Sequence, residues 1–287
     1  MLKVISLLSR YFTPYIQFYH HQKRRSVAGL SIDFAIWSTL GPFLHLIYSL
    51  IYYFSATIHS QWSNRYPTGV SPAGTWAQIN SPGGNLWLDM HNWVIWFLGI
   101  LALQALGQFR YTWNEEMEFS PIAQVIIIFA SLVLLGGILS VEFGGGWLTV
   151  SGLVWLDVVD WIGLVGQWAE FVRYWPQISM HWLAQSTAGL ATGFVWVDGL
   201  GALVALCGLY LRASQVQQSQ VKDLGVESAE SVWILMTRPT NEFFLAVGKL
   251  LVFCILVLQK YKWYAGQRSL IRRKYKQVSD VELNDLD

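Results

Sequence analysis

Charged residues are scarce in this sequence. Asp, Glu, Lys and Arg make up 13% of its 287 residues, and the net charge at pH 7 is +1. A surface that binds nucleic acid needs many basic residues to neutralise phosphates, so nucleic acid is excluded as a partner. The protein classes that remain are those whose members function with few charged residues.

Cysteine and recognisable catalytic motifs are also nearly absent. The two cysteines, Cys207 and Cys254, both lie within apolar stretches, so no disulfide framework is expected. The sequence contains no catalytic triad, phosphate-binding glycine loop or zinc-ligand spacing. We therefore predict a protein that is not an enzyme and that holds neither a metal nor a cofactor.

Apolar residues are abundant and make up 54% of the chain. They gather in runs of about 20 residues, which is the length of helix that crosses a hydrocarbon core about 30 Å thick. We therefore predict an all-α membrane protein, with the lipid bilayer as its surroundings. The seven transmembrane helices that we expect cover residues 2–20, 30–56, 92–110, 121–142, 155–184, 189–212 and 242–263.

Two segments about 160 residues apart resemble each other. Residues 173–199 contain Pro-Gln, then Ser-Thr-Ala-Gly-Leu, then an acid, and residues 12–34 contain Thr-Pro, then Ser-Val-Ala-Gly-Leu, then an acid. Each segment leaves one expected helix and enters the next, which is typical of transporters built from repeated halves. We predict two parallel three-helix repeats with a linking helix between them. The predicted parts are a first repeat (1–110), a linking helix (121–142), a second repeat (153–263) and a tail (264–287).

Basic residues predict the orientation. The 21–29 link contains three of them, and residues 260–276 contain seven, whereas the 57–91 loop contains only Arg65. Because Lys and Arg favour the cytosolic side, we expect the tail to be cytosolic. Within the tail, Tyr275 and Val278 form a Tyr-x-x-apolar sequence of the kind that clathrin adaptors bind, so both are candidate sorting residues. The alternative is that the basic tail only binds anionic lipid.

Two acids are candidate proton-coupling residues. Asp198 lies about nine residues into the expected helix 189–212, and a charged carboxylate at membrane depth costs a few kcal/mol or more. Such acids mark proton or ion pathways, although an Asp bonded to helix backbone or facing a wet cleft would be purely structural. Asp33 is the corresponding acid of the first segment, where compensation of the helix dipole accounts for it equally well.

The segments also contain candidate hinges. Pro176 should kink the expected helix 155–184 because proline removes one backbone hydrogen bond, and Gln177 can bond the freed groups. Pro14 and Gln17 are the candidates in the first segment. The alternative is a static kink that takes no part in motion.

Three residues are candidates for the lining of a solute cavity. His181 shares a helix face with Gln177, and Ser38 lies in the expected second helix. Lys249 lies inside the last expected helix, where it either extends to the surface or pairs with an acid such as Asp198.

These segments resemble the PQ-loop family of membrane proteins, and within it the lysosomal, proton-coupled exporters of cystine. The resemblance rests on residues 25–34, on Arg-Tyr-x-Pro-Gln and Ser-Thr-x-Gly within 173–189, and on Arg238-Pro239-Thr240. It implies seven helices and the proton-coupled export of a small polar solute, an amino acid that is cystine-like or cationic, from a lysosome or vacuole. It also implies that Asp198 is the proton-coupling acid.

The departures from the family fall on positions that contact the solute. His181 and Phe194 replace asparagines, and Phe253 replaces an aspartate. Proton coupling is therefore a firmer expectation than cystine recognition. A sugar facilitator like the SWEET proteins, and a non-transporting receptor or assembly factor, are the alternatives.

Overall fold

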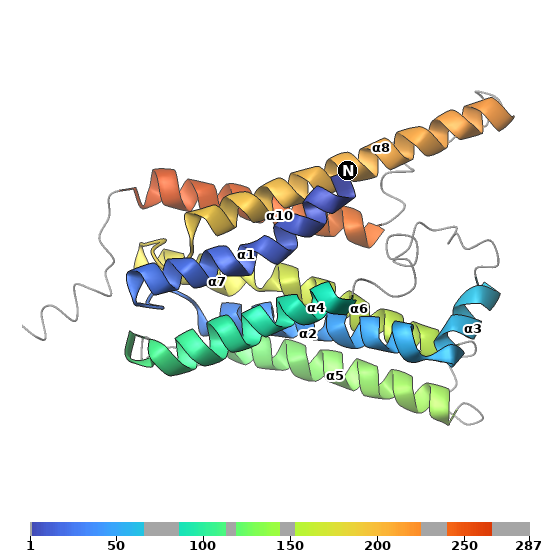
Figure 1. Ribbon diagram of the computed structural model, residues 1–287, viewed down its shortest axis with the longest axis horizontal. Helices are drawn as coiled ribbons and strands as arrows, with labels where there is room; N and C mark the ends of the chain where they lie inside the picture. Colours follow the sequence, from blue (N-terminus) through green and yellow to red (C-terminus); the bar gives the residue numbers. More distant parts are fainter. Residues whose placement is uncertain (1, 66–85, 113–118, 144–152, 225–239, 266–287) are drawn as a thin grey trace, which may run out of the picture.

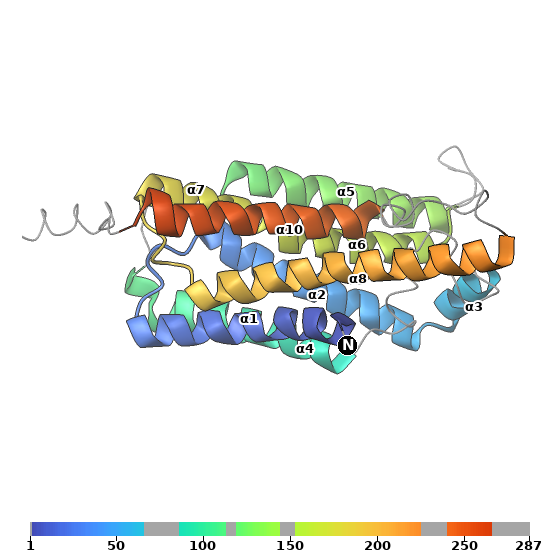
Figure 2. The same ribbon diagram turned by 90° about the horizontal axis from the view of Figure 1, so that it is seen from above.

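The computed structural model describes residues 2–65, 86–112, 119–143, 153–224 and 240–265. Within these ranges the chain is helical and contains no strand. The helices lie roughly along the long axis of the molecule, as Figures 1 and 2 show. The α-helices are α1 (Leu2–Arg24), α2 (Ile32–Phe54), α3 (Ala56–Arg65), α4 (Leu86–Val94), α5 (Pro121–Glu142), α6 (Trp155–Val172), α7 (Tyr174–Ala184), α8 (Thr192–Leu224) and α10 (Thr240–Leu258). The others are the π-helices η2 (Ile95–Gln108) and η5 (Gln259–Trp263) and the 3₁₀-helix η3 (Arg110–Thr112).

Five helical stretches in the described ranges are long and apolar enough to cross a membrane. They are Ile32–Phe54, Leu86–Gln108, Pro121–Glu142, Thr192–Gln215 and Phe243–Trp263. Two of the seven expected spans, those of α1 and α6, are not among them. The 18 residues of α6 include three acids, and α1 carries basic and polar residues along its length. Composition alone therefore supports an all-helical membrane protein with five spans.

Three further differences from expectation concern where helices begin and end. The expected helix 155–184 is divided at Arg173 into α6 and α7. The ring of Pro176 removes a hydrogen bond to the carbonyl of residue 172, so the interruption falls where proline chemistry places it. In addition, α3 lies within the expected 57–91 loop, and α8 continues to Leu224, beyond the expected end at residue 212.

The helices from the two halves of the sequence alternate in space. The first helix, α1, packs on α8, and the second, α2, packs on α6. Within the halves, α2 packs on α4 and η2, and α8 packs on α10. The linking helix α5 contacts α6 and lies at the edge of the bundle, as Figure 1 shows.

The core lies between the two halves. Its largest cluster combines Phe34 and Trp96 with Tyr174 and Phe194, all at most 2% exposed. Phe34 makes edge-on contacts with the other three rings at centroid distances of 5.8–6.1 Å. In a bilayer, such close packing stabilises helix association because lipid tails are as apolar as the side chains.

One end of the bundle collects the links that carry the repeated sequences. The C-terminal ends of α1, η2, α7 and α10 lie together there, at the left of Figure 1. The backbone amide of Val27 donates to Thr112 Oγ1 at 2.9 Å, which ties the 25–31 link to η3. We call this the link end of the bundle.

Candidate functional site

Two buried glutamines bind the links at this end in the same way. Gln17 in α1 donates from Nε2 to the carbonyl of Gly189 and accepts at Oε1 from the amide of Ala191, both at 2.9 Å. Gln177 in α7 makes the same two bonds, also at 2.9 Å, with the carbonyl of Gly29 and with the amide two residues later. We call each glutamine with its two backbone partners a clasp. Each half of the chain thus holds the link of the other half.

A histidine and a second glutamine extend each clasp. His21 Nε2 lies 2.7 Å from the amide nitrogen of its clasp glutamine, and its Nδ1 lies 2.9 Å from Gln104 Oε1. His181 repeats the pattern at 2.8 Å, with its Nδ1 3.2 Å from Gln259 Oε1. Because the amide oxygens accept, Nδ1 carries the proton in both rings and Nε2 accepts. All six side chains are at most 1% exposed.

The two clasped links touch each other through glycines. Gly29 has a φ of +84°, a left-handed conformation that glycine adopts without strain. A Cβ atom on Gly189 would lie 1.9 Å from the carbonyl carbon of Gly29. The links can approach this closely only because both positions lack a side chain.

The matched clasp residues are 160 positions apart, and this offset pairs other residues of the two halves. It pairs Asp198 with Ser38, and Asp33 with Gly193. The expectation that Asp33 is the repeat counterpart of Asp198 is therefore wrong. Asp33 accepts at 3.1 Å from the amide of Ser120, just before α5, so it ties α2 to the linking helix. Asp33 follows Gly29 by four residues, whereas Asp198 follows Gly189 by nine, so the two acids lie at different positions after their glycine turns.

With the same offset, the two prolines do not correspond. The counterpart of Pro176 is Ile16, and Pro14 lies two positions earlier in an α1 that continues without interruption. Gln17, in contrast, occupies the position that corresponds to Gln177. The first half therefore retains the glutamine of the motif and lacks the break in the helix.

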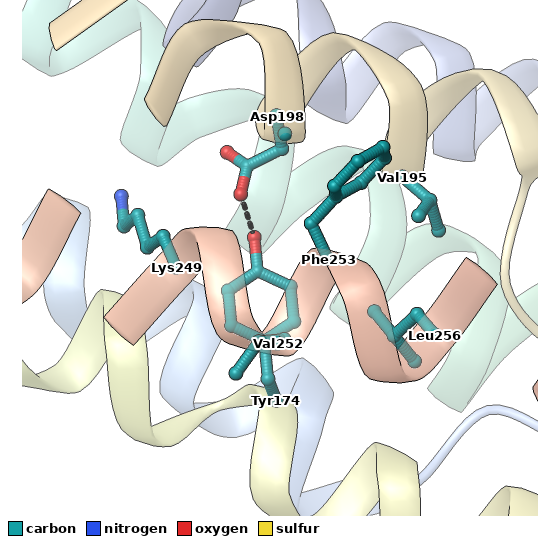
Figure 3. A pocket seen from close by; sticks show the side chains of 8 residues that line it. Tyr174, Val195, Asp198, Lys249, Val252, Phe253 and Leu256 are labelled. Carbon is teal, nitrogen blue, oxygen red and sulfur yellow. Dashed lines mark hydrogen bonds between the residues drawn. The ribbon is translucent and has the colours of Figure 1, made fainter. Parts of the chain in front are cut away.

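Asp198 forms the centre of a polar site inside the bundle. The hydroxyl of Tyr174 donates to its Oδ2, as Figure 3 shows. Arg173 Nη2 lies 3.7 Å from its Oδ1. Arg173 also donates from Nη2 to the Tyr174 hydroxyl at 2.8 Å. The break between α6 and α7 is thus tied to α8 through three side chains.

Arg173 lies within a cage of aromatic rings. Its guanidinium carbon is 4.9–5.7 Å from the centroids of Phe34, Trp96, Tyr174 and Phe194. A cation over a ring that is shielded from water gains about 2 kcal/mol or more. The side chain is 4% exposed, and within the described residues its Nε makes no hydrogen bond. The cage therefore holds a cation beside Asp198 with contributions from both halves of the chain.

A second ion pair lies near the first. Lys249 Nζ in α10 is 3.5 Å from Glu170 Oε2 in α6, one turn before Arg173. Lys249 also lines a small cavity, of about 10 Å³, together with Asp198 and Tyr174. The remaining lining is Val195, Gly199, Val252, Phe253 and Leu256 (Figure 3). A volume of this size is close to the minimum for one water molecule, so the cavity is too small for a solute in this conformation.

The structure places the three candidate cavity residues from the sequence in different parts of the bundle. Lys249 lines the cavity with Asp198, and it pairs with Glu170. His181 belongs to a clasp and Ser38 is fully buried, and neither is among the residues that line this cavity. Tyr275 and Val278, with the rest of the tail, lie outside the described residues, so their sorting role stays a prediction.

Sequence reasoning missed Arg173 and Glu170. Arg173 counted only as part of the Arg-Tyr-x-Pro-Gln motif near a helix end, and Glu170 was not singled out. A usable signal existed, because Arg173 is the sole Lys or Arg between residues 155 and 184 and Glu170 lies one turn before it. Isolated charges of opposite sign on one membrane helix point to a buried polar site.

The chain is similar to cystinosins over most of its length, although no family model matches it. It is 24% identical over 272 residues to the cystinosin of Drosophila melanogaster, which covers 93% of this chain. It is 20% identical to the cystinosin of Bos taurus over 87% of the chain, and 20% identical to a cystinosin homolog of Dictyostelium discoideum over 90%. The chain spans 59% of the length of the first two relatives and 77% of the third.

Proposed function

We propose that this chain is a proton-coupled transporter that exports a small polar solute, an amino acid, from an acidic organelle such as a lysosome or vacuole. The observation that carries the proposal is an acid inside the helix bundle, Asp198, whose side chain is 13% exposed, accepts from Tyr174 and lines a cavity. An acid inside a membrane protein is costly, so its retention indicates a pathway for protons or ions. Similarity to cystinosins supports the same conclusion.

We also propose that the helices form two parallel three-helix repeats joined by α5, crossing the membrane seven times. If the two repeats are equivalent, α1 corresponds to α6 and α2 corresponds to α8. The packing of α1 on α8 should then be matched by the packing of α6 on α2, and both contacts occur. The two clasps support the same symmetry. The acids of α6 do not argue against a span because they have partners, such as Tyr52 with Asp160 at 3.0 Å and Arg65 with Asp157.

In this mechanism the proton acts at the junction of α6, α7 and α8. While Asp198 is ionised, it attracts Arg173 and accepts from Tyr174, so α8 stays tied to the break before Pro176. Protonation removes the negative charge and with it the attraction for Arg173. The break then becomes a hinge at which α7 moves relative to α6 and α8.

The clasps form the gate on the link end, which we place on the cytosolic side. Opening this end requires the loss of four hydrogen bonds to Gln17 and Gln177, each with a net contribution of about 1 kcal/mol. The gate therefore resists opening by about 4 kcal/mol until solute and proton binding favour the open form. A closed gate and a cavity too small for a solute belong to the same conformation.

Transport in liposomes tests the proposal. The purified chain is reconstituted, and uptake of labelled amino acids is measured with and without an inwardly directed proton gradient. Uptake that the gradient drives supports the proposal. Sugar uptake that is indifferent to the gradient would instead support a facilitator like the SWEET proteins, and absence of all flux would support a non-transporting receptor or assembly factor.

A further inference from the structure

The ion pair between Lys249 and Glu170 is loose. Its 3.5 Å separation exceeds the distance of about 2.7–2.9 Å that is typical of a charge-assisted hydrogen bond. The Lys249 side chain is 21% exposed, whereas that of Glu170 is 7% exposed. The ammonium group is therefore held near the acid without a tight bond, and it is the more accessible partner.

The surroundings of Lys249 suit a solute that has one charged end and one apolar end. Tyr174 and Asp198 supply the other polar atoms of the cavity. The rest of the wall is mostly apolar, and Figure 3 shows Phe253 and Leu256 on the same helix as Lys249. A carboxylate beside the ammonium group would leave the remainder of the solute against the apolar wall.

The charges around the cavity are balanced only while Asp198 is ionised. The charged groups are the carboxylates of Asp198 and Glu170 and the cations of Arg173 and Lys249. The other titratable groups that face them are the Tyr174 hydroxyl from α7 and His45 from α2, whose ring lies against Gly166, one turn before Glu170. A proton on Asp198 leaves the four charged groups with one excess positive charge. A solute carboxylate beside Lys249 compensates this charge locally, while the ammonium group of an amino acid keeps the net charge of the solute at zero.

We propose that Lys249 binds the carboxylate of the transported solute and that Glu170 holds Lys249 while the site is empty. This inference rests on the proposed transport function and narrows it to one substrate class, amino acids with a single carboxylate and an uncharged side chain. The proton on Asp198 favours binding of the carboxylate, because it removes a negative charge that would repel the carboxylate. The cavity must widen for the solute, which frees Lys249 from Glu170.

Ligand-induced stabilisation tests this assignment without any proton gradient. The unfolding midpoint of the purified full chain is measured with each L-amino acid that has an uncharged side chain. The measurement is repeated with the matching amino-acid amide, which has the same side chain and no carboxylate. We expect at least one amino acid to raise the midpoint and its amide to have no effect. Lys249→Gln should raise the half-saturating concentration at least tenfold, and Lys249→Arg less. Glu170→Gln should lower it several-fold because it releases the ammonium group.

Lys262→Gln, at an exposed lysine near the end of the same helical stretch, is the matched control and should bind as the wild type does. Equal stabilisation by acid and amide, wild-type affinity in Lys249→Gln, or no stabilisation by any amino acid would each overturn the assignment. If Lys249→Gln does not fold, weaker binding in Glu170→Gln also overturns it. Binding through Lys249 without proton-driven flux would contradict only the transport proposal, whereas flux that is insensitive to Lys249 would contradict only this inference.

Discussion

Replacing Gly189 by alanine should open both clasps at once. The added Cβ would lie 1.9 Å from the carbonyl carbon and 2.0 Å from the carbonyl oxygen of Gly29. Ordinary contact begins near 3.4 Å, so the two links must separate by about 1.5 Å. A separation of that size stretches the 2.9 Å clasp bonds beyond hydrogen-bonding distance. Four lost bonds, at about 1 kcal/mol each, predict destabilisation by about 4 kcal/mol.

Reversible unfolding of the purified chain in mixed detergent micelles measures this change. Gly136→Ala is the matched control, because a Cβ at this position in α5 meets nothing within 4 Å. It should leave stability unchanged or raise it by up to about 1 kcal/mol, as alanine does in a helix. If Gly189→Ala changes the free energy of unfolding by less than about 1 kcal/mol, the direct contact between the links is refuted, and with it the gate built on it.

Two further substitutions test the clasps and the hinge. Gln17→Ala and Gln177→Ala each remove three buried hydrogen bonds, two to the backbone and one to a histidine ring. They should destabilise the chain by similar amounts, about 2–4 kcal/mol in reversible unfolding, whereas a large effect from Gln177 alone would contradict the equivalence of the clasps. Pro176→Ala restores a backbone hydrogen bond, so it should join α6 to α7, stabilise the chain and slow solute uptake into liposomes. Wild-type turnover in that variant would mean that the break is static.

The helices were largely predictable from sequence, because an apolar run of membrane length must satisfy its backbone hydrogen bonds internally and a helix does so. The interruption at Arg173 was also foreseeable from Pro176. The packing of the halves was not, since the sequence does not state which helices touch. Neither the alternation of α1 with α8 and of α2 with α6 nor the contact between the two glycine links could be read from spacing alone.

The candidate site was only partly predictable. Asp198 stood out because it is an isolated acid in an apolar helix, and Gln17 and Gln177 stood out through the repeated motif. His181 was singled out beside Gln177, but His21, Gln104 and Gln259 were missed, because buried polar side chains in a membrane helix have no distinctive pattern in one sequence. The aromatic cage around Arg173 was missed for the same reason, since its four rings come from four separate helices.

The role of Asp198 as the proton carrier is the central claim, and Asp198→Asn tests it most directly. In liposomes, solute accumulation driven by a pH gradient is compared with solute exchange at equal pH, with Asp33→Asn as the matched control. Asparagine keeps the shape of the side chain and cannot be ionised, so we expect the variant to lose gradient-driven accumulation and retain exchange. Asp33→Asn should retain both. Gradient-driven accumulation at the wild-type level in Asp198→Asn would contradict the account.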